Sequence, residues 1–241
     1  RDLNRSFPGA ARGSLTGRLA HLFMTEVVAR SDLGIDLHSA AMHRINLPQI
    51  RISATSETAA EMAQAFRAPV TIEAGLREGS LRAAAGEKGV DILLFEAGEA
   101  LRLDETSAGV GTAGILRVMR AQSMIAGTGV PKARAASIRT TGTHWLRAPA
   151  GGLFRAYRTI GDSVEPADVL GVVAGPFGEV ETEVRNLHPV VIIGRRTMPI
   201  VNEGDALLHI GVTRRSDTGK TIDALTAIDE IGTLLDEDEI L

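Results

Sequence analysis

Segments with helical spacing alternate with short apolar runs over the first half of the chain, and this alternation constrains the fold more than any other feature. Apolar residues at helical spacing, with Ser or Thr as candidate N-caps, indicate the helices. The helical patterns cover residues 14–29, 55–68, 80–85 and 106–124, and the strand patterns cover residues 34–38, 48–54, 70–72 and 90–95. Such alternation predicts an α/β layer sandwich.

The pattern changes at residues 129–131 (Gly-Val-Pro), after which helical spacing disappears. Short β-type runs follow as far as residue 212, separated by turn signals such as Gly161-Asp162 and Gly175-Pro176. The last segment is polar and acidic, which is typical of a solvated terminus. We therefore predict three parts, an α/β domain at 1–132, a small all-β domain at 133–212 and a polar, acidic tail at 213–241.

The chain contains no cysteine among its 241 residues. Disulfides, thiolate zinc sites, iron–sulfur clusters and a thiol nucleophile are therefore excluded, and any metal must be held by His, Asp or Glu. A net charge of −4 argues against a nucleic-acid partner. Neither a membrane span nor a signal peptide is visible, which predicts a cytoplasmic protein with no membrane partner. Because the sequence begins at Arg1 rather than Met, we interpret it as a piece of a longer protein.

A histidine ends the first predicted strand, in the motif Asp36-Leu37-His38-Ser39. In an open α/β sheet, ligands bind outside the carboxyl ends of the strands, so His38 is a candidate to contact a metal or a substrate. Alternation along the strand places Asp36 and His38 on the same side, where Asp36 can orient the imidazole. The alternative, which is the commoner case for a lone histidine, is a hydrogen-bonded structural residue.

A carboxylate follows the most apolar predicted strand, in the motif Phe95-Glu96-Ala97-Gly98-Glu99. Low-dielectric walls beside Glu96 favour a general base at this position. A cap or a surface ion pair is the alternative.

Near the N-terminus, Asn4 and Arg5 share one short loop, where the guanidinium and the amide are suited to bind a substrate carboxylate. A solvated loop is the alternative there.

Residues 109–114 match the pattern G-x-G-x-x-G of dinucleotide-binding proteins. That motif requires a strand immediately before it and an acidic residue about 20 positions later, and neither is present. We therefore interpret the glycines as a loop that enters a helix. The remaining histidines show no ligand spacing and are interpreted as structural, at positions 21, 43, 144, 188 and 209.

Three motifs in this order, R-D-L-N-R-S-F-P-G, D-L-H-S and F-E-A-G-E, resemble the succinylglutamate desuccinylase/aspartoacylase family. The family is a branch of the zinc carboxypeptidase-like hydrolases. The resemblance implies an α/β three-layer sandwich with a mixed central sheet. It also implies an appended all-β barrel-sandwich domain, which A-P-A-G-G-L-F, G-D-S-V and V-L-G-V-V resemble.

The resemblance implies that His38 is a zinc ligand and that Glu96 is the general base that activates zinc-bound water. Asn4 and Arg5 would hold the substrate carboxylate, with Asp36 behind His38. The remaining ligands, in an H-x-x-E motif, would lie upstream of Arg1. The expected reaction is zinc-dependent hydrolysis of the amide of a small N-acyl amino acid, with N-acetyl-diaminobutyrate deacetylase as one specific candidate.

Two other functions remain open at this point. The chain is alternatively a non-catalytic binding or assembly module that keeps the fold without its metal, or a zinc carboxypeptidase that acts on peptides. The β-rich half is expected to wall the active site or to make a homo-oligomer contact. It cannot carry biotin or lipoate, because no lysine occurs between residues 133 and 219.

Overall fold

In this computed structural model, the described residues are 2–133, 136–140, 142–178 and 180–213. The tail predicted at 213–241 therefore lies outside the described residues from position 214 onward. The helices are η1 (Leu3–Arg5), α1 (Leu15–Glu26), η2 (Val28–Arg30), α2 (Glu57–Phe66), α3 (Leu81–Gly86) and α4 (Glu105–Ala121), where η marks a 3-10 helix. The strands are β1 (Leu33–Ala40), β2 (Arg44–Ile52), β3 (Val70–Glu73), β4 (Asp91–Glu99), β5 (Ile138–Thr140), β6 (Thr143–Arg147), β7 (Gly152–Ala156), β8 (Ser163–Val164), β9 (Val169–Ala174), β10 (Glu181–Arg185), β11 (Val190–Arg196), β12 (Ile200–Val201) and β13 (Ala206–Val212).

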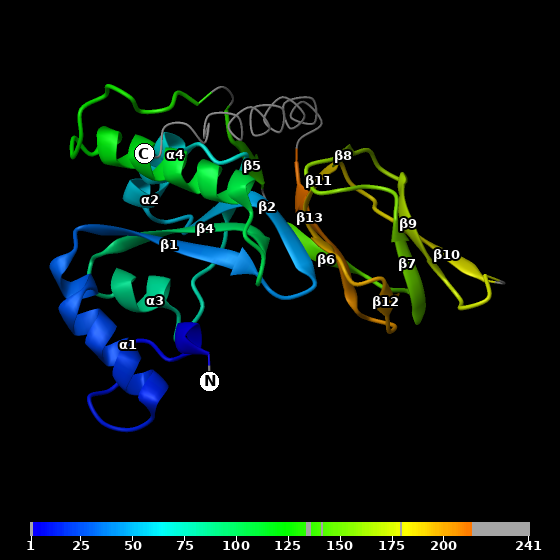
Figure 1. The fold of residues 1–241 in the computed structure, drawn as a ribbon, viewed down its shortest axis with the longest axis horizontal. Helices are drawn as coiled ribbons and strands as arrows, with labels where there is room; N and C mark the ends of the chain where they lie inside the picture. The colour runs from blue at the N-terminus through cyan, green and yellow to red at the C-terminus, as the bar shows by residue number, and fades with distance from the viewer. Residues whose placement is uncertain (1, 134–135, 141, 179, 214–241) are drawn as a thin grey trace.

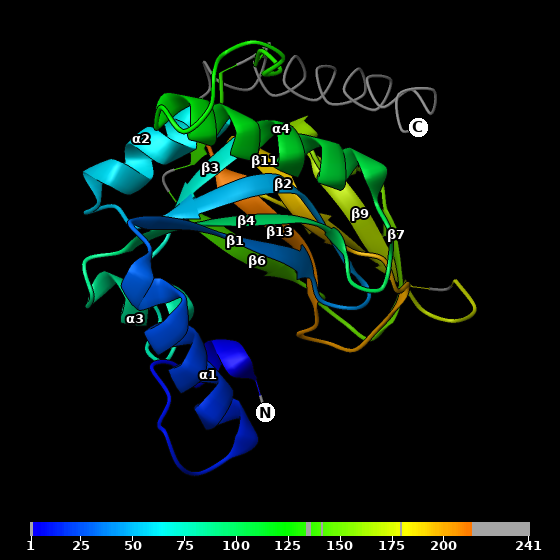
Figure 2. The same cartoon turned by 60° about the vertical axis from the view of Figure 1, so that its left-hand side comes forward.

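The predicted layered α/β architecture with a mixed sheet is confirmed. A nine-stranded sheet runs in the order β1-β4-β2-β11-β13-β6, with β3, β5 and β8 paired beside this path. The pair β1–β4 is parallel and the pair β2–β4 is antiparallel, so the sheet is mixed. Helices α2 and α4 cover one face and α1 and α3 the other (Figures 1 and 2).

Strand β4 explains why the two faces have separate cores. Successive side chains of a strand point to opposite faces. Accordingly, Leu93 and Phe95 pack with residues of α2 and α4, whereas Ile92 packs with residues of α1 and α3. The sequence had predicted that Glu96 follows its strand and that His38 ends its strand. Instead, β4 extends to Glu99 and β1 extends to Ala40, so both residues lie within their strands.

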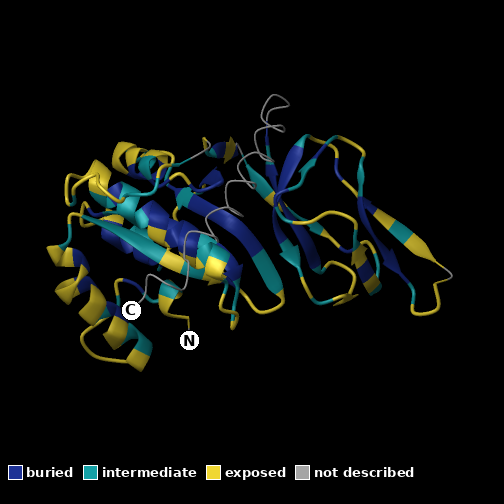
Figure 3. Cartoon of the chain, turned by 45° about the horizontal axis from the view of Figure 1, so that its top comes forward, coloured by how far each residue is buried: buried dark blue, intermediate teal, exposed yellow. Residues whose placement is uncertain are grey.

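The predicted helices are present and begin at capping residues. The side chains of Ser14, Ser56 and Ser80 accept hydrogen bonds from the first turns of α1, α2 and α3. Each bond satisfies an N–H group that has no partner within its helix. In α1, the buried residues are Ala20 and Met24. The apolar stripe of the sequence pattern faces outward instead (Figure 3), at Leu15, Leu19, Leu22, Phe23 and Val27.

The strands of the β-rich half are divided between two sheets, and the predicted small all-β domain is not confirmed. Strands β6, β11 and β13 continue the large sheet, because β11 pairs with β2 at Gly194 and Arg195. Only β7, β9, β10 and β12 form the second, four-stranded sheet. An apolar cluster that includes Leu170, Ile192 and Leu207 packs the two sheets together.

The glycines at 109–114 lie inside helix α4, so their interpretation as a loop was wrong. Their function in the fold is close packing. A Cβ on Gly111 would lie 3.2 Å from the Phe95 ring, and a Cβ on Gly114 would lie 2.3 Å from the Phe66 ring. The missing side chains therefore let α4 approach α2 and β4.

We expect Gly114→Ala to destabilise the protein by about 1–3 kcal/mol, because the fully buried Phe66 ring has no room to move away. The higher helix propensity of alanine offsets at most about 1 kcal/mol of this cost. Urea unfolding measures the change. Gly86→Ala is the matched control, because Gly86 is helical and a Cβ there meets nothing within 4 Å. Equal stability of the Gly114→Ala variant and the wild type would contradict the packing role.

Candidate active site

A cleft of about 700 Å³ lies on the α3 side of the large sheet, and we call it the main cleft. Both halves of the chain line it. The α/β half contributes the predicted residues Asn4, Arg5, His38 and Glu96. It also contributes four further arginines, at positions 44, 51, 77 and 82. The β-rich half contributes Thr143, His144, Trp145 and His209. The β-rich half therefore walls this cleft, which is one of the two roles expected for it.

Strand pairing brings His38 and Glu96 together. In the parallel pair β1–β4, His38 is the register partner of Glu96. Residues paired in register on neighbouring strands project from the same face of the sheet, and both side chains line the main cleft. The sequence prediction that these two residues share one site thus agrees with the geometry, although their chemical roles stay predictions.

Three donors from β2 hold the Glu96 carboxylate. Arg51 contacts Glu96 Oε2 through Nη2 at 3.0 Å and Nε at 3.2 Å. The side-chain amides of Asn46 and Gln49 donate to the same oxygen at 3.2 and 3.4 Å. Glu96 therefore does form an ion pair, as the alternative interpretation allowed. However, its side chain is only 20% exposed, and Oε1 has no partner among the described residues.

The predicted contact between Asp36 and His38 is present. Asp36 Oδ2 lies 3.0 Å from His38 Nε2. This hydrogen bond, together with the Asp36 and Glu96 charges, raises the pKa of His38 above its ordinary value against the opposing effect of burial. Because the bond uses Nε2, the ring nitrogen left for another partner is Nδ1.

The donor set for zinc is incomplete in the described part of the chain. A catalytic zinc ion takes three protein ligands and keeps one open position. No group of three or more His, Asp or Glu residues suited to a metal occurs among the residues that the structure describes. His38 fits as a single ligand, but these residues alone do not fit a complete zinc site.

Asn4 and Arg5, predicted to lie in a loop, are part of the 3-10 helix η1, which lies against the start of α3. Asn4 Oδ1 accepts a hydrogen bond from the Leu81 backbone N–H at 2.8 Å, so its oxygen has a structural use. A Cβ on Gly79 would lie 2.7 Å from the Arg5 carbonyl oxygen, which shows how closely the two segments approach. The Arg5 side chain itself is exposed at the cleft. Both residues thus line the cleft, and their binding of a substrate carboxylate stays a prediction.

Sequence reasoning missed Arg82 of α3 and the polar residues of β2. Arg82 is partly buried in the main cleft, and its buried Nη1 has no hydrogen-bond partner within the described ranges. Burial first, and then the nearby Arg51 charge, lower the pKa of Arg82 from its ordinary value. A signal for β2 existed, because Asn46 and Gln49 are polar residues among the apolar residues of the middle of the strand. Gln49 is fully buried, and such a residue requires partners.

An aromatic stack forms the wall contributed by the β-rich half. The rings of Trp145 and His209 stack with centroids 4.7 Å apart, because the two residues are register partners on β6 and β13. Burial, followed by the charges of Arg51, His144 and Arg44, lowers the pKa of His209 to about 3. His209 is therefore neutral in the folded protein at neutral pH.

We expect acid to destabilise the protein through His209. Its pKa is 6.5 by default and about 3 in the folded state, so between these values only the unfolded chain binds the proton. Stability is therefore lost as the pH falls through this window, by about 2 kcal/mol between pH 7 and pH 5. His209→Phe keeps an aromatic ring but cannot titrate. Urea unfolding at the two pH values should show that this variant loses about 2 kcal/mol less free energy of unfolding than the wild type. Equal losses in the two proteins would show that His209 is not the cause of the acid sensitivity.

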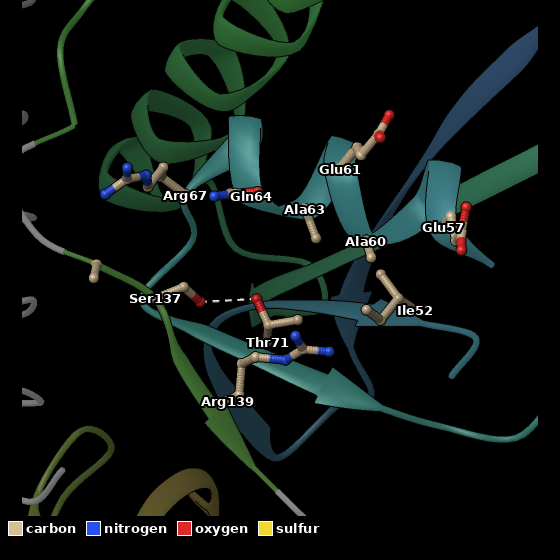
Figure 4. Close-up of a pocket in the computed structure, with 11 residues that line it drawn as sticks. Ile52, Glu57, Ala60, Glu61, Ala63, Gln64, Arg67, Thr71, Ser137 and Arg139 are labelled. Carbon is tan, nitrogen blue, oxygen red and sulfur yellow. Dashed lines mark hydrogen bonds between the residues drawn. The ribbon is translucent and has the colours of Figure 1, made fainter. Parts of the chain in front are cut away.

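A second hollow of about 560 Å³ lies beside α2, β3 and β5 (Figure 4). Thr71 Oγ1 and Ser137 Oγ contact each other at 2.8 Å in its wall. Ile52 lines this hollow while its neighbour Arg51 lines the main cleft, so the two cavities open on opposite faces of β2. None of the predicted site residues lines the second hollow.

Solved structures with the same fold were found in several bacteria. A succinylglutamate desuccinylase/aspartoacylase from Rhodobacter sphaeroides is 23% identical with a TM-score of 0.76, over 89% of this chain and 67% of that one. The ectoine utilization protein EutE (DoeB) from Ruegeria pomeroyi is 24% identical with a TM-score of 0.78, over 88% and 70%. An aspartoacylase family protein from Mesorhizobium loti is 21% identical with a TM-score of 0.70, over 89% and 67%. At these identities, the likeness shows the fold.

No curated protein matches the sequence. None of the helices in the described ranges is long and apolar enough to cross a membrane. Residues 1–122 match the family described as succinylglutamate desuccinylase/aspartoacylase catalytic domain, and this match spans more than half of the chain. The matched range contains η1 with Asn4 and Arg5, and also His38 and Glu96. The chain therefore belongs to the succinylglutamate desuccinylase/aspartoacylase family of deacylases.

Proposed function

We propose that the protein hydrolyses the amide bond of an N-acyl amino acid in the main cleft, with Glu96 as the general base. The observation that supports this most is the position of Glu96, which lies in register with His38 on a buried strand. Its carboxylate is held through Oε2, and Oε1 faces no described partner. A carboxylate fixed in this way is suited to take a proton from water and to return it to the leaving amine.

The cationic groups of the cleft would bind the substrate. Arg82 presents a buried guanidinium nitrogen that has no partner among the residues the structure describes, and Arg5 presents an exposed guanidinium. Guanidinium groups bind carboxylates through paired N–H donors, so these arginines would hold the α-carboxylate of the amino acid. Asn4 positions the start of α3, which carries Arg82, through its bond to Leu81.

Zinc dependence is part of the proposal, with His38 as one ligand through Nδ1. The other ligands would have to come from outside the described residues, since these gather no group of three donors. The substrate proposed in most detail is N-acetyl-diaminobutyrate. It is supported by the fold shared with the ectoine utilization protein, and the family resemblance alone supports a broader range of N-acyl amino acids.

The test is release of free amine from N-acetyl-diaminobutyrate, N-acetylaspartate and N-succinylglutamate, with an unblocked dipeptide as the comparison. Amine release from an N-acyl amino acid, with the dipeptide left intact, supports the proposal. Cleavage of the dipeptide alone would favour a carboxypeptidase.

A non-catalytic binding module is the second candidate, and the incomplete donor set favours it. Elemental analysis of the purified protein distinguishes the two functions. One zinc ion per chain that is lost in His38→Ala supports the hydrolase. A protein without zinc and without amine release would be the binding module.

A further inference from the structure

The guanidinium of Arg44 lies over the ring of Trp145, with its Cζ 4.9 Å from the ring centroid. Within the described residues, this guanidinium has no hydrogen-bond or ion-pair partner, and it lines the main cleft. A cation–π contact with the ring uses none of the N–H groups as hydrogen-bond donors, so those of Arg44 stay available to bind an anion. Arg44 is therefore oriented but not neutralised.

The Trp145 ring also contacts a second ring. The His209 ring stacks on it with an interplanar angle of 7°, and His209 is only 6% exposed. Because the His209 ring is uncharged, it does not repel the nearby cationic Arg44. We call these three residues the Arg44 clamp.

The sheet places the Arg44 clamp beside the proposed catalytic group. In the row across the sheet, Gly194 pairs with His209 on one side and with Asn46 on the other. A Cβ on Gly194 would lie 2.7 Å from Asn46 Oδ1 and 3.2 Å from His209 Cβ, so the glycine lets the two residues approach. Asn46 donates to Glu96, and Arg44 precedes it by two residues on the same face of β2, about 7 Å along the strand.

The charge of the main cleft favours an anionic ligand with more than one acidic group. Five arginines line it, against the three carboxylates of Asp2, Glu73 and Glu96. Two of these carboxylates already pair with arginines, Glu73 with Arg139 and Glu96 with Arg51. The cleft thus concentrates positive charge in a chain whose net charge is −4.

We propose that Arg44, held by Trp145 and His209, is a specificity-determining residue that binds a second carboxylate of the ligand. The proposal rests on the proposed function, because the first carboxylate is the one assigned there to Arg82 and Arg5. The second carboxylate belongs to the acyl group or to the side chain of the amino acid. In either position, it lies beyond Glu96 on the side of the β-rich half.

Binding can be measured without turnover, because Trp145 is the only tryptophan of the chain and reports on the clamp by its fluorescence. Two pairs of ligands show whether the second carboxylate belongs to the acyl group or to the amino-acid side chain. The two members of each pair have a similar shape. N-succinylglycine is compared with N-butanoylglycine, and N-acetylglutamate with N-acetylnorvaline. The wild type should bind the dicarboxylate of one pair about 10–100-fold more tightly than its monocarboxylate partner.

Arg44→Gln should abolish this preference while leaving the affinity for the monocarboxylate within about 2-fold. Arg18→Gln, which removes the same charge from α1 outside the cleft, should keep the preference. His209→Ala should weaken the preference, and His209→Phe should retain it, which a general loss of structure would not reproduce. Circular dichroism confirms that each variant is folded.

The proposal is overturned if the wild type shows no preference in either pair, or if Arg44→Gln retains it. Failure of the proposed function is a separate result. If the protein releases no amine but prefers dicarboxylates through Arg44, the proposed role of Arg44 is supported and the proposed hydrolase activity is contradicted. If the protein releases amine equally well with and without Arg44, the hydrolase activity is supported and the proposed role of Arg44 is contradicted.

Discussion

Glu96→Gln should lower kcat for amine release by about 10²–10⁴-fold, which is the range for loss of a general base. Glutamine has nearly the same shape as glutamate, and its carbonyl oxygen can still accept from Asn46, Gln49 and Arg51. The substituted side chain should therefore stay in place while losing the ability to take a proton. KM should change little, because the substrate carboxylate is bound elsewhere.

Asp91→Asn is the control for this prediction. It removes one negative charge from the same strand, β4, but Asp91 does not line the main cleft. Its kcat should stay within about 2-fold of the wild type, in line with a surface substitution. A Glu96→Gln variant with wild-type kcat would remove Glu96 from the mechanism.

Arg82→Met should raise KM by about 10–100-fold with kcat nearly unchanged. Methionine preserves the apolar stem that packs in the cleft and removes only the guanidinium. A hydrogen bond to a charged group is worth about 1.5–3 kcal/mol, which corresponds to this range in affinity. An interaction made equally in the ground state and the transition state appears in KM and not in kcat.

Comparison with Arg5→Ala shows which of the two arginines, Arg82 or Arg5, contributes more to binding of the substrate carboxylate. Arg5 is exposed, and its Nη1 already contacts the Asn4 carbonyl oxygen, so solvent screens its interaction with a ligand. We expect its KM to rise less than that of Arg82→Met. A larger effect of Arg5→Ala would show that η1, and not α3, holds the carboxylate.

The first half of the fold was predictable because its signals are local. A serine before an apolar helical pattern specified the start of three helices, and the run at β4 specified a central strand. The continuation of the sheet was not predictable in this way. The pairing of β2 with β11 joins residues about 150 positions apart, and no local pattern encodes such a partner.

The candidate site shows the same division. His38 and Glu96 were found because polar residues near predicted strand ends are candidates to contact a ligand, although both strands continue past these residues. Arg82 was missed because a short helix does not reveal which side chain will lack a partner after packing. Trp145 and His209 were missed for a different reason, since their meeting depends on the register of β6 and β13, which the sequence does not display.

The central claim is that the main cleft binds the amide of an N-acyl amino acid at Glu96. A crystal structure of the Glu96→Gln variant with N-acetylaspartate tests it most directly. The account predicts the amide carbonyl within about 4 Å of the side chain at position 96, close to His38, with a carboxylate on Arg82. A ligand bound in the hollow beside α2, or in the main cleft with its amide turned away from β4, would contradict the account.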